Sequence, residues 1–163
     1  MPSINRRSLL GSCSVAIMSS IAGCANLLGQ SSPPAGSLKF VNDHTVPHSI
    51  TMRVIDVGSQ PGEAPGTVSG KISVVPEQRE LSASMVVEPG NTNVYPEIFT
   101  ASVWYAVRFT IDGRQPQDSA GKVAFNPAPQ GDKNGSILVG KVYPSGEFSW
   151  VISRTENMGS FEN

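Results

Sequence analysis

The two histidines of this chain, His44 and His48, are the first side chains whose spacing could do chemistry. They lie four residues apart in the stretch HTVPH, and Asp43 beside them could supply a third metal ligand. On a helix this spacing would place both imidazoles on one face, but Pro47 and two β-branched residues favour a turn between strands. Because two histidines alone seldom complete a tetrahedral site, we expect a polar loop with solvated imidazoles. A metal site at His44 and His48 is the alternative.

The cysteine content of the chain excludes a blue-copper site. Such a site needs two histidines, a cysteine thiolate and usually an axial methionine. Methionines are available, but Cys13 and Cys24 both lie near the N-terminus, and residues 25–163 contain no cysteine. The same count excludes a disulfide framework and a thiolate metal site from this part of the chain. We expect no cofactor.

Catalytic constellations are scarce in the sequence. A hydrolase triad needs a serine, a histidine and a carboxylate, yet both histidines fall in one loop. No GxSxG nucleophile elbow is present, and no phosphate-binding loop or paired-carboxylate motif stands out. We therefore expect that the protein is not an enzyme.

Trp104 is the aromatic residue of most interest for binding. In the run VWYAVRFTID it alternates with five apolar residues, so it lies on the opposite side of a strand, together with Arg108 and Asp112. If that side meets solvent, Trp104 could stack on a sugar or anchor a protein partner. The alternatives are that both sheet faces are partly covered or that Trp104 packs over Arg108. Single exposed apolar residues are also normal on protein surfaces.

Period-two alternation of apolar residues predicts the strands that position these side chains. Four runs alternate strongly, and they span residues 37–42, 48–56, 103–112 and 146–154. Weaker runs span residues 71–75, 80–88, 121–125 and 136–143. No window of about 12 residues after the N-terminal stretch combines helical spacing with helix caps.

These strands, about seven to nine in number, predict an all-β fold, an antiparallel immunoglobulin-like sandwich. The sequence PSGE is predicted to close a hairpin between the last two strands. Two long loops, at residues 57–70 and 113–135, interrupt the pattern. Their Gly and Pro content favours flexible segments.

The N-terminal stretch has the features of a cleaved signal peptide. Arg6 and Arg7 precede an uncharged, moderately apolar run from Ser8 to Ala22. A membrane-spanning helix needs roughly 20 apolar residues, so this shorter run favours a signal peptide over residues 1–23. The arginine pair and the leucines of NRRSLLG resemble a twin-arginine export signal. An ordinary Sec signal, in which paired arginines also occur, is the alternative.

The sequence Ile21-Ala22-Gly23-Cys24 resembles the lipobox of prokaryotic lipoproteins, in which an aliphatic residue and two small residues precede a cysteine. The resemblance implies that Cys24 becomes the lipidated first residue of the mature protein, on the extracytoplasmic face of the cell membrane. A lipid with two acyl chains holds a protein stably on a membrane. The alternative is a buried apolar helix that contains an inert cysteine.

The mature chain is expected to have three parts. Residues 24–36 carry the lipid on Cys24 and form a flexible tether, because they are small, polar and rich in Pro and Gly. Residues 37–156 form the β-sandwich, and residues 157–163 form a C-terminal tail.

The order of these parts resembles small secreted lipoproteins of halophilic archaea. The resemblance is carried by the leader and by LKFVNDHTVPHSITMRV, VVEPGNTNVYPEIFTASVWYAVRFTIDG and ILVGKVYPSGEFSWVIS. It implies a twin-arginine lipobox leader followed by a compact β-sandwich of unassigned biochemistry. Such proteins are usually far more acidic than this chain, whose 13 carboxylates face 12 basic residues.

This charge balance bears on the partners. A nucleic-acid binder usually shows a clustered basic face, which the sequence lacks, so we expect no nucleic acid. We expect a membrane-anchored lipoprotein whose β-sandwich has a structural or binding role without catalysis. The alternatives are a module that binds a polysaccharide or protein through Trp104, and a metal-binding protein that uses His44 and His48.

Overall fold

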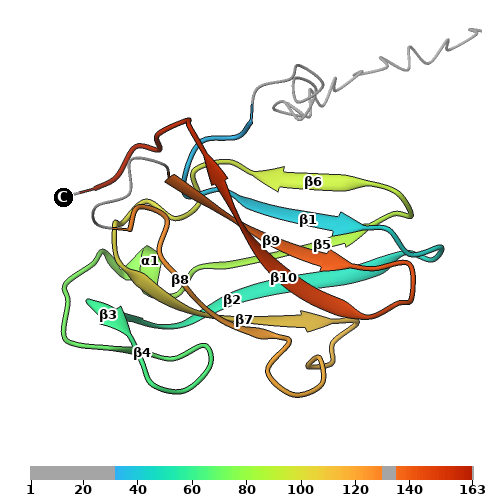
Figure 1. The fold of residues 1–163 in the computed structure, drawn as a ribbon, viewed down its shortest axis with the longest axis horizontal. Coiled ribbons are helices and arrows are strands. Elements are labelled where there is room, and N and C mark those ends of the chain that lie inside the picture. Colours follow the sequence, from blue (N-terminus) through green and yellow to red (C-terminus); the bar gives the residue numbers. More distant parts are fainter. Residues whose placement is uncertain (1–31, 130–134, 163) are drawn as a thin grey trace, which may run out of the picture. The chain divides into compact units, whose positions relative to one another are not determined.

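The structure, a computed structural model, describes residues 32–129 and 135–162. The predictions for Arg6, Arg7 and Cys24, and for residues 1–31 generally, lie outside these residues. The described chain is mostly β (Figure 1). Its elements are β1 (Leu38–Asn42), β2 (His48–Gly58), β3 (Gln60–Pro61), β4 (Val68–Ser69), α1 (Pro76–Arg79), β5 (Ser82–Val87), β6 (Thr92–Tyr95), β7 (Trp104–Ile111), β8 (Lys122–Phe125), β9 (Gly135–Val142) and β10 (Phe148–Thr155).

Eight of these strands form two four-stranded sheets, in the orders β10-β9-β1-β6 and β5-β2-β7-β8. Strands β3 and β4 pair with each other. The expected antiparallel arrangement is confirmed for six of the seven strand pairings, since only β1 and β9 run parallel among the described strands. The hairpin predicted at PSGE is confirmed, because β9 and β10 pair antiparallel on either side of it.

The hydrophobic core takes its side chains from the inward faces of both sheets. Phe109 on β7 makes ring contacts with Phe40 on β1 and Phe148 on β10, at centroid distances of 6.5 and 5.1 Å. Gly140 on β9 makes room for this ring, because a Cβ at that position would lie 2.9 Å from Phe109. The alternation of apolar residues along the chain is therefore satisfied by burial of one face of each main strand.

Most of the predicted strands are confirmed. The four strongly alternating runs correspond to β1, β2, β7 and β10. The runs at 80–88 and 121–125 contain β5 and β8, and the run at 136–143 overlaps β9. The inward face of β10 becomes less buried along the strand: Phe148 is buried, whereas Ile152 is 39% exposed. This follows from the position of β10 at the edge of its sheet.

One strand prediction was wrong, and one strand of the two main sheets was not predicted. Residues 71–75 are not a strand; Ile72 and Val74 pack partly buried against the core without a pairing partner, and the chain then enters α1. No strand was predicted at β6, because its first two residues, Thr92 and Asn93, are polar. Strand β6 is a four-residue edge strand that pairs with β1 alone, a setting that tolerates Asn and Thr.

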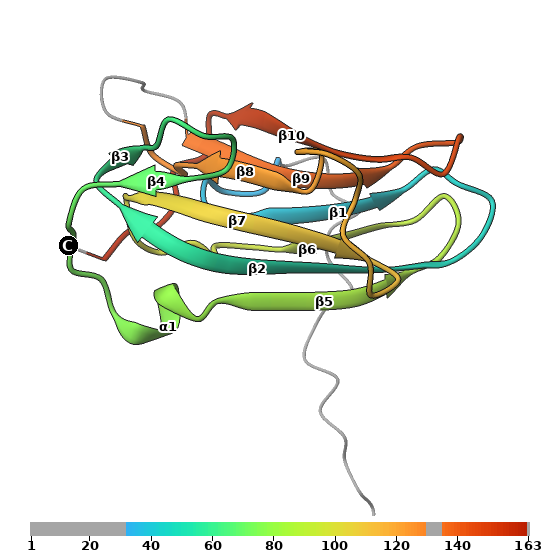
Figure 2. The same ribbon diagram turned by 90° about the horizontal axis from the view of Figure 1, so that it is seen from below.

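The predicted loop at residues 57–70 is also more ordered than expected. It continues β2 to Gly58 and then forms the β3–β4 hairpin, whose turn is closed by a hydrogen bond from Gly62 N to Thr67 O of 2.8 Å. The second predicted loop, residues 113–135, contains β8, and its residues 130–134 lie outside the described part of the chain. The hairpin and α1 lie at one end of the domain, and the β1–β2 loop and the β9–β10 turn lie at the other (Figures 1 and 2).

The last residues of the predicted tether pack against the domain. Ala35 is fully buried, its amide donates to Asn157 O, and Gly36 N donates to Ser136 O. The predicted C-terminal tail is held as well, because Glu162 N donates to Thr100 O. The packed domain thus extends beyond the expected bounds of 37 and 156. Within the described ranges, no helix has the length and apolar character needed to cross a membrane.

Candidate functional site

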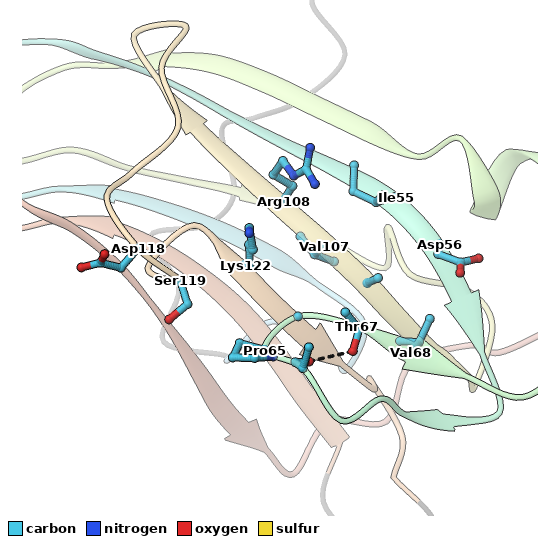
Figure 3. A pocket seen from close by; sticks show the side chains of 13 residues that line it. Ile55, Asp56, Pro65, Thr67, Val68, Val107, Arg108, Asp118, Ser119 and Lys122 are labelled. Atoms are coloured by element: carbon cyan, nitrogen blue, oxygen red, sulfur yellow. Dashed lines mark hydrogen bonds between the residues drawn. The ribbon is translucent and has the colours of Figure 1, made fainter.

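A cavity of about 510 Å³ lies on the outer face of the β5-β2-β7-β8 sheet (Figure 3). Tyr105, Val107 and Phe109 of β7 point into the core, so the alternate residues Ala106 and Arg108 face the other way. The cavity is lined from β2, β7 and β8, from the β3–β4 turn and from the loop before β8. It falls in the size range of small-molecule sites, roughly 300–1,000 Å³.

The β3–β4 turn forms one wall of this cavity. Gly66 in the turn has φ +70°, a conformation that glycine adopts readily. An added Cβ at Gly66 would lie 2.6 Å from the Cβ of Lys122 on β8. The β3–β4 turn, which follows β2, therefore extends across the sheet and contacts β8. This contact encloses the space between the turn and the sheet.

A β-bulge in β2 supplies the opposite part of the lining. The register with β7 shifts between Val54 and Asp56, which leaves Ile55 as an extra residue. Regular alternation would send Ile55 and Asp56 to opposite faces of the sheet, yet both line the cavity. Bulges commonly re-aim side chains in this way beside binding and active sites.

Three cations lie side by side across this face. Arg53 on β2 pairs in register with Arg108 on β7, and Arg108 pairs with Lys122 on β8. Adjacent strands are about 4.8 Å apart, and like charges directly opposite each other destabilise a sheet. We call these three residues the cationic row.

Arg108 forms no ion pair with the described residues around it. Its Nε is the one buried side-chain nitrogen or oxygen without a hydrogen-bond partner in the part of the chain that the structure describes. The ion pairs found there, His48–Asp112 and Lys141–Asp43, involve no member of the row. Leaving such a donor unpaired costs about 1–3 kcal/mol.

Two carboxylates also line the cavity, at its opposite ends. Asp56 lies on one side of Arg108 and Lys122, and Asp118 on the other (Figure 3). Asp56 Oδ1 accepts a hydrogen bond of 2.8 Å from Val57 N. Thr67 and Ser119 add hydroxyl groups to the lining. The site thus offers positive charge at its centre and hydrogen-bond acceptors at its ends.

Tyr105 forms a buried polar cluster at the start of the same strand, on the core side. Its hydroxyl donates to Gln78 Oε1 at 2.6 Å and accepts from Ala101 N at 3.1 Å. Gln78 in α1 also accepts from Thr100 N at 3.0 Å and donates to Ile98 O at 3.2 Å. Burial raises the pKa of Tyr105 to about 12, so the hydroxyl remains a neutral donor. We call Tyr105, Gln78 and their backbone partners the tyrosine cluster.

The predicted metal candidates, His44 and His48, lie at the other end of the domain and contact each other. Their rings stack at 5.0 Å, His44 Nδ1 lies 2.8 Å from His48 Nε2, and His48 Nδ1 lies 2.8 Å from Asp112 Oδ2. Asp43, the expected third ligand, instead pairs with Lys141 at 2.5 Å, and this hydrogen bond raises the pKa of Lys141. Across the described ranges, no group of three or more His, Cys, Asp or Glu is placed to hold a metal ion.

The His44–His48–Asp112 chain is arranged as a hydrogen-bond relay. Burial tends to raise the pKa of Asp112, but hydrogen bonds from His48 and from Ser49 N outweigh it and hold this pKa below its usual value. When His48 is neutral and its Nδ1–H donates to the ionised Asp112, its Nε2 can accept from His44 Nδ1–H. The relay ties the β1–β2 loop to the end of β7.

Trp104 lies on the outer face, as its phase predicted, but it is half-buried. Its register partner on β2 is Gly58, and a Cβ there would lie 3.0 Å from Val68 Cβ on β4. The β3–β4 hairpin thus lies close to Trp104. Trp104 does not line the cavity that contains Arg108.

A second cavity, of about 600 Å³, lies between residues 114–120 and the β9–β10 turn. It contains no buried donor or acceptor without a partner. The first cavity is therefore the stronger candidate for a binding site. Sequence reasoning placed Arg108 on the outer face but missed the row, because the alignment of three strands is needed to bring Arg53, Arg108 and Lys122 together. Comparison with known proteins adds no homologue: no family model, curated protein or solved structure matches this chain.

Proposed function

We propose that this protein is an exported, lipid-anchored protein whose β domain binds a ligand without transforming it. The observation that carries the binding role is the cavity on the outer face of β2, β7 and β8, in which Arg108 Nε is buried and unpaired. Unsatisfied buried donors are rare in folded proteins and call for a partner such as water or an ion. A bound ligand is the partner that this cavity favours.

The anchoring part of the proposal is supported by the sequence. Arg6 and Arg7 precede a short uncharged run, and the lipobox-like sequence IAGC ends at Cys24. Lipidation on Cys24 would place the β domain at the extracytoplasmic face of the cell membrane. The cysteine-free remainder of the chain leaves Cys24 without a disulfide partner in the mature protein.

The mass of the protein isolated from its native membrane tests the anchor. We expect loss of residues 1–23 and a gain that corresponds to a diacylglyceryl group on Cys24. A Cys24→Ser variant is expected to leave the membrane fraction, while a Cys13→Ser variant, which changes a residue of the predicted signal, keeps its lipid. A soluble native product that is cut at another position would contradict the proposal.

In this proposal, the polar residues near the β1–β2 loop have a packing role. His44, His48 and Asp112 bond to one another, and these bonds join the β1–β2 loop to the end of β7.

We also propose that the domain is an immunoglobulin-like sandwich at the level of its architecture. The shared core of the two sheets supports this, as does the bond from Tyr105, at the start of β7, to the backbone of Ala101. A tyrosine hydroxyl bonded to backbone a few residues upstream is the tyrosine corner of such sandwiches. The strand order differs from antibody constant domains, which hold their first two strands in one sheet; here β1 and β2 lie in different sheets.

A further inference from the structure

The cationic row indicates the charge of the ligand. Arg53, Arg108 and Lys122 are neighbours in register, and no described carboxylate forms an ion pair with them. Their mutual repulsion and the unpaired Nε of Arg108 both oppose folding. An anion seated on Arg108 and Lys122 would relieve both costs, because a guanidinium binds a carboxylate through two parallel hydrogen bonds.

The rest of the lining indicates that the anion carries a single charge and several hydroxyl groups. Asp56 and Asp118 flank the two cations of the cavity (Figure 3), so a ligand with many negative charges would be repelled at both ends. Carboxylates accept hydrogen bonds from hydroxyl groups, and Thr67 and Ser119 offer further polar contacts. Thr67 already donates its hydroxyl hydrogen to Ala64 O at 2.7 Å, which leaves its oxygen free to accept.

We propose that this cavity binds an acidic sugar, with its carboxylate on Arg108 and Lys122 and its hydroxyl groups toward Asp56 and Asp118. The inference rests on the proposed binding function and names the class of its ligand. The side chains of Ile55 and Val68, together with Pro65, supply the apolar part of the lining, against which the C–H groups of a sugar ring can pack. A volume of about 510 Å³ suits one or two sugar units.

Calorimetric titration of the purified full chain tests the proposal with a matched pair of disaccharides. Cellobiouronate and cellobiose differ in one carboxylate, and inorganic phosphate serves as a sugar-free anion. We expect cellobiouronate to bind, and cellobiose to bind at least about 10-fold more weakly, since a hydrogen bond to a charged group is worth roughly 1.5–3 kcal/mol or about a 10- to 100-fold change in affinity. Phosphate is expected to bind more weakly than cellobiouronate.

The variants Arg108→Met and Lys122→Met are each expected to reduce the affinity for cellobiouronate by about 10-fold or more. Lys71→Met removes an exposed lysine that does not line the cavity and is expected to leave the affinity unchanged. Circular dichroism of each variant shows whether it has folded, and two independent substitutions keep the test decisive if one fails.

Three results would overturn the inference: equal binding of both disaccharides, binding of phosphate alone, or binding of cellobiouronate that neither substitution weakens. Binding of phosphate through Arg108 would refute the acidic sugar and leave the binding function intact. If none of the three probes binds, the acidic sugar is refuted, and the mass of Cys24 still decides the anchor independently.

Discussion

Strand β7 contributes Tyr105 to the tyrosine cluster and, three residues later, Arg108 to the cationic row. The two side chains differ in whether their buried polar groups have hydrogen-bond partners. Tyr105 points into the core, and its hydroxyl is bonded to both Gln78 and Ala101. Arg108 points away from the core, and its buried Nε has no partner. A fully paired buried cluster stabilises one arrangement of the chain. An unpaired donor in a cavity instead costs stability and is available to a ligand.

The first and largest test of this contrast is Tyr105→Phe. We expect the free energy of unfolding to fall by about 2 kcal/mol, because Ala101 N loses its acceptor in the core and Gln78 loses a donor. Denaturation with urea at pH 7 measures the change. Tyr143→Phe is the matched control, since Tyr143 is 37% exposed, and it should change stability by less than about 0.5 kcal/mol.

The stability difference between the wild type and Tyr105→Phe is also expected to depend on pH at high pH. The pKa of Tyr105 is raised from 10.0 to about 12 in the folded protein. A raised pKa means that the folded state holds this proton more tightly, so its contribution is complete below pH 10 and is lost as the pH rises toward 12. The difference between the wild type and Tyr105→Phe should therefore shrink over this range. A difference that stays constant would show that burial does not perturb Tyr105.

Substitution of Arg108 by Met should change the free energy of unfolding in the opposite direction to Tyr105→Phe. We expect the free energy of unfolding, measured without ligand, to rise by about 1 kcal/mol, because the variant removes an unpaired buried donor and the repulsion from Arg53 and Lys122. Lys71→Met is again the control and should have little effect. A loss of stability at Arg108→Met would mean that this side chain is compensated in the ligand-free protein, and the contrast with Tyr105 would disappear.

The smallest change in the free energy of unfolding is expected at Asp112. Its carboxylate has hydrogen-bond partners, as Tyr105 does, but it is half-exposed. Asp112→Asn should lower the free energy of unfolding by about 0.5 kcal/mol near neutral pH, since exposed ion pairs contribute little. The pKa of Asp112 lies below 3.8 in the folded state, so its contribution is present above pH 3.8 and is lost as the pH falls through the folded value. Urea denaturation of both proteins at pH 6 and pH 2.5 checks this. A difference that persists unchanged at pH 2.5 would contradict it.

The strands could be predicted where burial is one-sided. Leu38 and Phe40 of β1, and Tyr105 and Phe109 of β7, alternate with less buried residues because each strand has a core face and an outer face. The strand prediction failed at β6 and at residues 71–75 for opposite reasons. The first is an edge strand that tolerates polar residues, and the second buries alternate side chains without any pairing partner.

The candidate site could be predicted only in fragments. The phase of β7 placed Arg108 on the outer face. The position of His44 and His48 in one loop predicted solvated imidazoles in preference to a metal site, but the two rings stack on each other and His48 is only 12% exposed. Neither pattern could show that His48 meets Asp112, which lies 64 residues away. The bulge at Ile55, which turns Asp56 into the cavity, breaks the very alternation on which the strand prediction relies.

The sequence by itself determined that residues 25–163 contain no cysteine, that apolar residues repeat with period two, and that the fold is therefore mostly β. These properties are local, since they depend on each residue and its near neighbours. The tertiary structure alone decided that β1 runs beside β9, that the β3–β4 turn rests on Lys122, and that three cations share one row. Such pairings join distant segments, and their register is set by the packing of the whole core.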